Sequence, residues 1–164
     1  MKKWLIGVAC SFSTVALAQS DGGLYYAGKK FSFTQAVERG LAQNPGPGAR
    51  FFVVAVPPET LGLSQVAPKP LTSLRTRAQT GGAQFYVCQR DIDAGTVKIK
   101  DLVPGVVAVR GWPPAGSNEL PAGSRYFIDE DPLKLPPSTT VLRRLREICT
   151  DIESQPRRTP TRVQ

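Results

Sequence analysis

The sequence predicts an α/β fold built around a mainly parallel β-sheet, and three observations support this prediction. Short apolar runs rich in β-branched and aromatic residues recur along the chain, as is typical of strands that are buried on both faces. Segments with apolar residues at helical spacing separate these runs. Clusters of Gly and Pro mark the boundaries. Strands that alternate with helices in this way indicate parallel pairing with right-handed crossovers.

The first strand and the first helix are expected near the N-terminal end of this pattern. The short apolar run 24–27 predicts the strand. Ser32 then stands three residues before Gln35, which is the spacing of a capping box, and apolar residues recur behind it at helical intervals. We therefore expect a helix over about 32–43. The Pro- and Gly-rich segment 44–48 ends it.

The centre of the chain contains the strongest strand signals. Residues 51–56 form a continuous apolar run, and they predict the main core strand. Residues 59–69 are expected to form a loop or a short helix. Pro70 is placed as the first residue of a second helix, which Gly81 and Gly82 end. Residues 83–88 then predict another good strand.

The second half of the sequence predicts less regular structure. Residues 91–100 indicate a turn of helix and a loop, and 106–109 follow as another core strand. The segment 112–137 is rich in Gly and Pro, so we expect it to be irregular, with an edge strand at 125–128.

The last element is predicted to be an amphipathic helix over 139–153, with Ser138 or Thr139 as its cap. Apolar residues recur there at helical spacing on one face. They are Val141, Leu142, Leu145, Ile148, Cys149 and Ile152.

Residues 1–18 are expected to be a cleavable signal peptide. Lys2 and Lys3 precede a short apolar run that ends in Ala16-Leu17-Ala18, which is the order that a signal peptidase recognises. We expect a single domain over 19–154 and a basic, disordered tail over 155–164. The expected location is the periplasm, with no transmembrane anchor after cleavage, because the apolar run is shorter than the about 20 residues that a span requires.

The expected mature chain is basic. Without the two leader lysines it carries nineteen basic and thirteen acidic residues, a net charge of +6. A solvated helix face and a frayed terminus are the favoured interpretation of the arginine clusters, and electrostatic contact with anionic lipid, peptidoglycan or an acidic partner is the alternative. Nucleic acid is not expected as a partner. The clusters comprise Arg143, Arg144 and Arg146, and then Arg157, Arg158 and Arg162.

The residue types present exclude several kinds of site. The chain contains no histidine, which removes Ser-His-Asp triads, Cys-His dyads and His-ligated zinc. We expect neither a metal nor a cofactor. The acidic triplet 129–131 lacks the spacing of a calcium loop and is interpreted as a solvated turn. Trp112 is either a binding anchor or a packed loop residue, and packing is favoured.

Cys88 is the leading candidate for chemistry. It ends a predicted core strand, and sites collect at the carboxyl ends of strands in open α/β sheets. A thiolate there would be stabilised by a helix N-terminus. Gln89 and Arg90 are the candidate binding residues beside it, and Arg90 would add to this stabilisation. Three alternatives stay open: a reactive Cys88, a structural pairing of Cys88 with Cys149, and packing alone.

The segment Ala83–Cys88, followed by Asp101-Leu102-Val103-Pro104-Gly105-Val106, resembles the DsrE/DsrF-like family. The resemblance spans roughly residues 24–111 and is carried mainly by 81–109. It implies a compact three-layer α/β sandwich with a parallel sheet, often oligomeric. In some members a cysteine relays sulfane sulfur as a persulfide, and Cys88 occupies that position.

Two hypotheses for the function follow. In the first, the protein is an exported DsrE-like thiol or sulfur-relay protein that acts through Cys88. In the second, it is a non-catalytic module for protein contacts in an envelope or conjugative-transfer assembly. Such a module would have this fold or a thioredoxin-like one, and Cys88 and Cys149 would then have a structural role. Its partner would be an envelope protein or a second copy of the chain.

Overall fold

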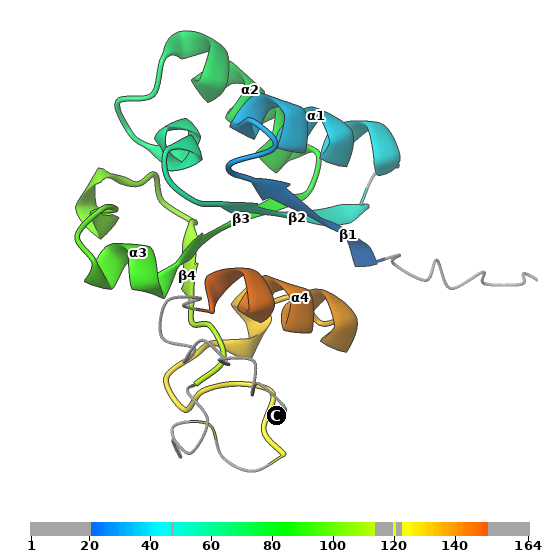
Figure 1. The fold of residues 1–164 in the computed structure, drawn as a ribbon. Helices are drawn as coiled ribbons and strands as arrows, with labels where there is room; N and C mark the ends of the chain where they lie inside the picture. The colour runs from blue at the N-terminus through cyan, green and yellow to red at the C-terminus, as the bar shows by residue number, and fades with distance from the viewer. Residues whose placement is uncertain (1–20, 47, 114–119, 121–122, 151–164) are drawn as a thin grey trace, which may run out of the picture.

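The fold is seen in a computed structural model of the chain, which describes residues 21–46, 48–113, 120 and 123–150 (Figure 1). Four strands form one sheet in the order β1-β2-β3-β4, and every neighbouring pair is parallel. The prediction of an α/β fold with a parallel sheet is therefore confirmed. The strands are β1 (Asp21–Ala27), β2 (Arg50–Ala55), β3 (Ala83–Cys88) and β4 (Val107–Val109).

Helices cover both faces of this sheet and give the molecule three layers (Figure 1). One face carries α1 (Phe33–Gln43) and α2 (Lys69–Thr80), and the other carries α4 (Thr139–Cys149). Short helical segments fill the connections. They are η1 (Glu59–Leu63), α3 (Gln89–Asp93), η2 (Ile99–Asp101) and η3 (Pro132–Lys134).

The capping box predicted from the sequence opens α1. The hydroxyl of Ser32 accepts a hydrogen bond from the backbone N–H of Gln35 at 3.2 Å, and the backbone N–H of Ser32 donates to Oε1 of Gln35 at 3.0 Å. Two N–H groups that a helix start leaves unpaired are thus satisfied. The second helix begins at Lys69, one residue before the expected Pro70.

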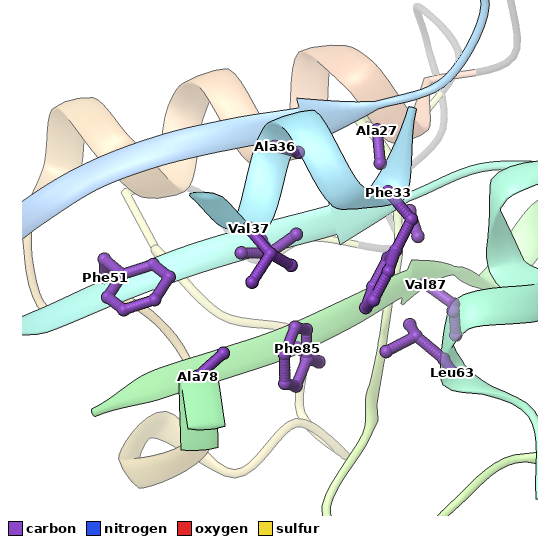
Figure 2. Packing of buried hydrophobic residues seen from close by; sticks show 11 residues of the cluster. Ala27, Phe33, Ala36, Val37, Phe51, Leu63, Ala78, Phe85 and Val87 are labelled. Atoms are coloured by element: carbon purple, nitrogen blue, oxygen red, sulfur yellow. The ribbon is translucent and has the colours of Figure 1, made fainter. Parts of the chain in front are cut away.

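The core on the α1 and α2 face is aromatic (Figure 2). The rings of Phe33 and Phe85 lie 5.8 Å apart between centroids, and Phe51 meets Tyr25 edge-on at 5.9 Å. Gly40 lets α1 approach the sheet, because a Cβ at this position would lie 2.3 Å from the ring of Phe51.

The opposite face of the sheet forms a second core with α4. Since side chains alternate along a strand, β2 sends Phe51, Val53 and Ala55 to one core and Phe52 and Val54 to the other. This explains why its sequence is apolar without interruption. Tyr86 of β3, Leu142 and Leu145 of α4 and both cysteines complete the second core.

The prediction of an edge strand at 125–128 is wrong. The segment forms bends and a turn, because side chains occupy its backbone groups. The backbone N–H of Phe127 donates to the carboxylate of Glu130 at 3.1 Å, and the carbonyl of Arg125 accepts from Arg146 at 2.9 Å. Groups used in this way cannot join a strand ladder.

Several expectations fall on residues outside the described ranges. The signal peptide at 1–18 and the tail at 155–164 are among them. The sequence predicts that the last helix reaches 153, but α4 ends at Cys149, and Thr150 has extended backbone. Within the described residues, no helix has both the length and the apolar character needed to cross a bilayer.

Candidate functional site at the disulfide

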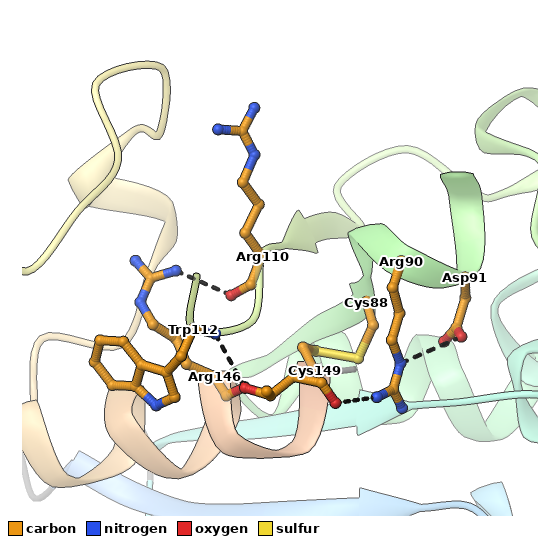
Figure 3. Close-up of a disulfide and its surroundings, with 8 residues drawn as sticks. Cys88, Arg90, Asp91, Arg110, Trp112, Arg146 and Cys149 are labelled. Atoms are coloured by element: carbon orange, nitrogen blue, oxygen red, sulfur yellow. Dashed lines mark hydrogen bonds and ion pairs between the residues drawn. A yellow bond between two sulfur atoms is a disulfide. The ribbon is translucent and has the colours of Figure 1, made fainter. Parts of the chain in front are cut away.

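The candidate cysteine lies where a central strand and the last helix meet. Cys88 is the last residue of β3, and Cys149 is the last residue of α4. Their sulfur atoms are joined in a disulfide, with the two Cα atoms 5.0 Å apart (Figure 3). Cys88 is 0 % exposed and Cys149 is 2 % exposed. Of the three alternatives for Cys88, the structure has the pairing with Cys149.

This arrangement bears directly on thiol chemistry. A nucleophilic cysteine needs a thiolate that its substrate can reach. Here the sulfur of Cys88 is bonded to the sulfur of Cys149, the last residue of α4, and both residues are buried. Cys88 does occupy the N-cap position of α3, but its side chain makes no capping hydrogen bond. The disulfide instead fixes the end of α4 to the carboxyl end of β3.

Arg90 strengthens the same junction. Its guanidinium donates through Nη1 to the carbonyl of Thr150, the residue that follows Cys149, and its Nε lies 3.6 Å from a carboxylate oxygen of Asp91 (Figure 3). Gln89 donates to the carboxylate of Asp93 at 2.8 Å. These two predicted binding residues therefore make contacts within the protein, and Arg90 holds the chain just beyond the disulfide.

Arg146 of α4 is the most buried charged residue among those the structure describes. The expected solvated basic face is wrong at this position, because the side chain of Arg146 is 0 % exposed. The missed signal is its spacing, since position 146 lies four residues after Leu142 and three before Cys149, on the buried face of the helix.

The guanidinium of Arg146 joins the residue that follows β4 to two residues of the segment 112–137. It pairs with both carboxylate oxygens of Glu130, one at 3.0 Å, and it donates to the carbonyls of Arg110 at 3.0 Å and Arg125 at 2.9 Å. It also lies 4.9 Å from the ring centroid of Phe127. A buried charge is tolerated only when it is paired and hydrogen-bonded in this way.

The acidic triplet 129–131 has three separate structural roles. Asp129 pairs with Arg110 at 2.6 Å, and Glu130 neutralises Arg146. Asp131 accepts a hydrogen bond from the backbone N–H of Leu133 at 3.0 Å and so caps η3. Across the described residues, no group of three or more His, Cys, Asp or Glu side chains is placed to hold a metal ion.

A second buried arginine, Arg75 of α2, lies on the other face of the sheet. Its Nη1 donates to the carbonyls of Gly62 at 2.7 Å and Ser64 at 3.1 Å, which ties α2 to η1 and the residue after it. Burial lowers the pKa of Arg75 because desolvation disfavours its charged form. An arginine nevertheless stays cationic at any physiological pH, so its role is to fix a loop.

Two hollows flank the disulfide junction. The first, about 490 Å³, lies at the carboxyl ends of the strands between Tyr26, Pro57, Arg90 and Ile148. The second, about 730 Å³, lies beside β4 and is lined by the Arg110–Pro113 segment, by Phe127 and Ile128, and by α3. Trp112 is partly exposed at 38 %, and its backbone N–H donates to Oγ1 of Thr150 at 3.0 Å.

The disulfide, Arg90 and Arg146 together are therefore suited to holding α4 and the segment 112–137 in one fixed geometry against the sheet.

Comparison of the chain with protein-family models, with curated proteins and with solved structures finds no match.

Proposed function

We propose that this protein is an exported, non-catalytic protein-interaction module of an envelope assembly, in which Cys88 and Cys149 form a structural disulfide. The observation that supports this most is the burial of both sulfur atoms in one disulfide between β3 and α4. The assembly would be of the secretion or conjugative-transfer kind, and the site of action is the periplasm.

The disulfide and the proposed location support each other. Disulfides form and persist in oxidising compartments, which include the bacterial periplasm. The N-terminal sequence has the order of a signal peptide, and a chain exported in this way would meet such conditions. A structural disulfide is therefore the expected state of two cysteines that fold to within bonding distance.

We also propose that the domain is a divergent member of the DsrE/DsrF-like family. The strand that ends at Cys88, followed by the Pro104-Gly105 turn that leads into β4, supports this assignment. A sulfur relay is the competing proposal from the same resemblance. It requires Cys88 as an accessible thiolate, and in the disulfide this sulfur has neither the charge nor the access.

The test uses the oxidised protein and a persulfide donor. The native, unreduced chain is incubated with glutathione persulfide, and the mass of the peptide that contains Cys88 is then measured without reduction. A structural disulfide predicts no added sulfur atom. A parallel sample that is reduced first controls for the intrinsic reactivity of the thiol.

Addition of one sulfur atom to Cys88 in the unreduced protein would contradict the proposal and support a sulfur relay. Labelling of native Cys88 by a maleimide before any reduction would contradict it as well, because it would require an accessible thiol.

A further inference from the structure

Three large apolar side chains are exposed on two segments that lie against each other. Leu61 is 49 % exposed, Val66 is 83 % exposed and Ile99 is 62 % exposed. The loop that holds Val66 is bonded to η2, because the backbone N–H of Gln65 donates to the carbonyl of Asp101 at 2.8 Å. We call these two segments, residues 59–69 and 98–102, the η1–η2 surface.

Hydrogen bonds fix the backbone of the η1–η2 surface. Nε2 of Gln65 donates to the carbonyls of Lys100 at 3.0 Å and Leu102 at 2.9 Å. The buried Arg75 holds the same loop through the carbonyl of Ser64 at 3.1 Å. The exposed apolar side chains therefore stand on a fixed backbone, and a preformed surface loses less conformational entropy on binding.

Lysines are concentrated around the η1–η2 surface. Five of the six described lysines lie on it or on the loop between β1 and α1, and all five are exposed. This loop adjoins η1, because the backbone N–H of Phe33 donates to the carboxylate of Glu59 at 2.6 Å. In the part of the chain that the structure describes, none of the five lysines has a carboxylate within 4.0 Å. They are Lys29, Lys30, Lys69, Lys98 and Lys100.

The charge and the residue types of this region indicate what it fits. Glu59 and Asp101 are its acidic residues, so five lysines and two carboxylates leave a net charge of +3. Exposed aliphatic groups beside unpaired lysines match a bilayer with anionic lipids, where aliphatic groups enter the headgroup boundary and ammonium groups meet phosphates. Protein interfaces are instead enriched in aromatic residues and Arg and depleted in Lys. The η1–η2 surface contains no aromatic residue and no Arg.

We propose that the η1–η2 surface binds the face of a bilayer that contains anionic phospholipids. Leu61, Val66 and Ile99 would enter the headgroup boundary, and the lysines would lie against the lipid phosphates. The inference goes beyond the proposed function, since it involves neither the disulfide nor a protein partner. Binding should be reversible and should weaken as salt rises, because salt screens the attraction between lysines and phosphates.

The test measures how the native, oxidised protein partitions onto vesicles by sedimentation. One vesicle type is an equal mixture of phosphatidylglycerol and phosphatidylcholine, and the other is phosphatidylcholine alone. The protein should bind the mixed vesicles and leave the neutral ones free. Lys98→Gln/Lys100→Gln should lower the partition coefficient about tenfold or more, because a lysine near an anionic surface typically contributes about fivefold. Val66→Ser/Ile99→Ser should lower it about fivefold or more through lost apolar burial.

Two variants on η3 are the matched controls. Leu133→Ser removes an aliphatic side chain that is 88 % exposed, and Lys134→Gln removes an exposed lysine. Neither residue belongs to the η1–η2 surface, so each should change the partition coefficient less than about twofold. Circular dichroism checks that each variant is folded.

Several results would overturn the membrane-binding surface. They are the absence of binding to the mixed vesicles, equal binding to both vesicle types, and binding that Val66→Ser/Ile99→Ser leaves unchanged. Equal losses in the surface variants and the η3 controls would overturn it as well. Light scattering that shows a dimer which Val66→Ser/Ile99→Ser dissociates would assign the surface to a second copy of the chain instead. None of these readouts depends on Cys88, so failure here would leave the structural disulfide standing.

Discussion

At the level of single residues, two side chains fix α4 and the residues before it against the sheet. Cys88 bonds to Cys149, and Arg146 binds Glu130 and two backbone carbonyls. Both interactions join α4 to segments that are distant in the sequence. Their energetic contributions differ in origin, since the disulfide acts mainly on the unfolded chain and the arginine acts in the folded state.

Removing the disulfide should destabilise the protein strongly. The double variant Cys88→Ser/Cys149→Ser is expected to lose about 4 kcal/mol of unfolding free energy, because the bridged residues are 61 positions apart and the loop restricts the unfolded chain. Urea unfolding monitored by circular dichroism measures this. The exposed Ser73→Ala variant of α2 is the control, with a change within about 0.5 kcal/mol. A loss below about 1 kcal/mol in the double variant would argue against a structural role.

Replacing Arg146 should also be costly. Arg146→Met removes the guanidinium from the carboxylate of Glu130 and from two carbonyls. Removal of one member of a buried ion pair typically costs about 3–5 kcal/mol. The control is Arg144→Met on the same helix, where the side chain is exposed and the change should stay within about 0.5 kcal/mol. Equal effects in the two variants, measured by urea unfolding, would contradict the buried role of Arg146.

At the scale of elements, close backbone approach places β4 against the end of α4. Gly111 follows β4, and a Cβ there would lie 2.4 Å from the carbonyl oxygen of Cys149 and 2.5 Å from Cα of Thr150. Only a glycine permits this contact without movement of the backbone. The position of α4 therefore depends on a residue outside both elements.

Gly111→Ala should consequently destabilise the protein by about 1–3 kcal/mol, as overpacking of a tight contact does. Gly46→Ala is the control, because a Cβ at Gly46 meets nothing within 4 Å. Thermal unfolding compares the two variants. A melting temperature for Gly111→Ala equal to that of the control would show that the helix end is not so closely packed.

The regular elements could largely be predicted from sequence because their signals are local. The capping box at Ser32 and the apolar run of β2 report the structure directly. The prediction of a strand at 125–128 is wrong because the backbone groups there bond to side chains of Arg146 and Glu130. Arg146 lies 21 positions from Arg125 in the sequence, and such a contact leaves no local periodicity. For the same reason, spacing alone could not choose between a free and a bonded Cys88.

At the scale of the whole molecule, the two cores differ in how they are connected. The α1 and α2 layer is built from crossovers between adjacent strands, whereas α4 follows the irregular segment and is tied back by the disulfide, Arg90 and Arg146. The stability of the second layer should therefore be more sensitive to redox conditions.

Reduction should loosen one layer before the other. Hydrogen exchange followed by mass spectrometry is expected to show faster exchange in α4 after reduction, while peptides from α1 and β2 keep their protection. The reason is that elements with the fewest stabilising contacts open most easily, and reduction removes one such contact from α4. Uniform acceleration across the chain would instead indicate that the two layers unfold as one unit.

The oxidation state of Cys88 in the native protein distinguishes a structural disulfide from a reactive thiol. The native protein, isolated from the cells that produce it, is denatured in excess alkylating agent without reductant, and its peptides are mapped by mass spectrometry. We predict no alkylated Cys88 or Cys149 and a single cross-linked peptide pair that contains both. Recovery of Cys88 as an alkylated or persulfidated peptide, with no cross-link to Cys149, would contradict a structural disulfide.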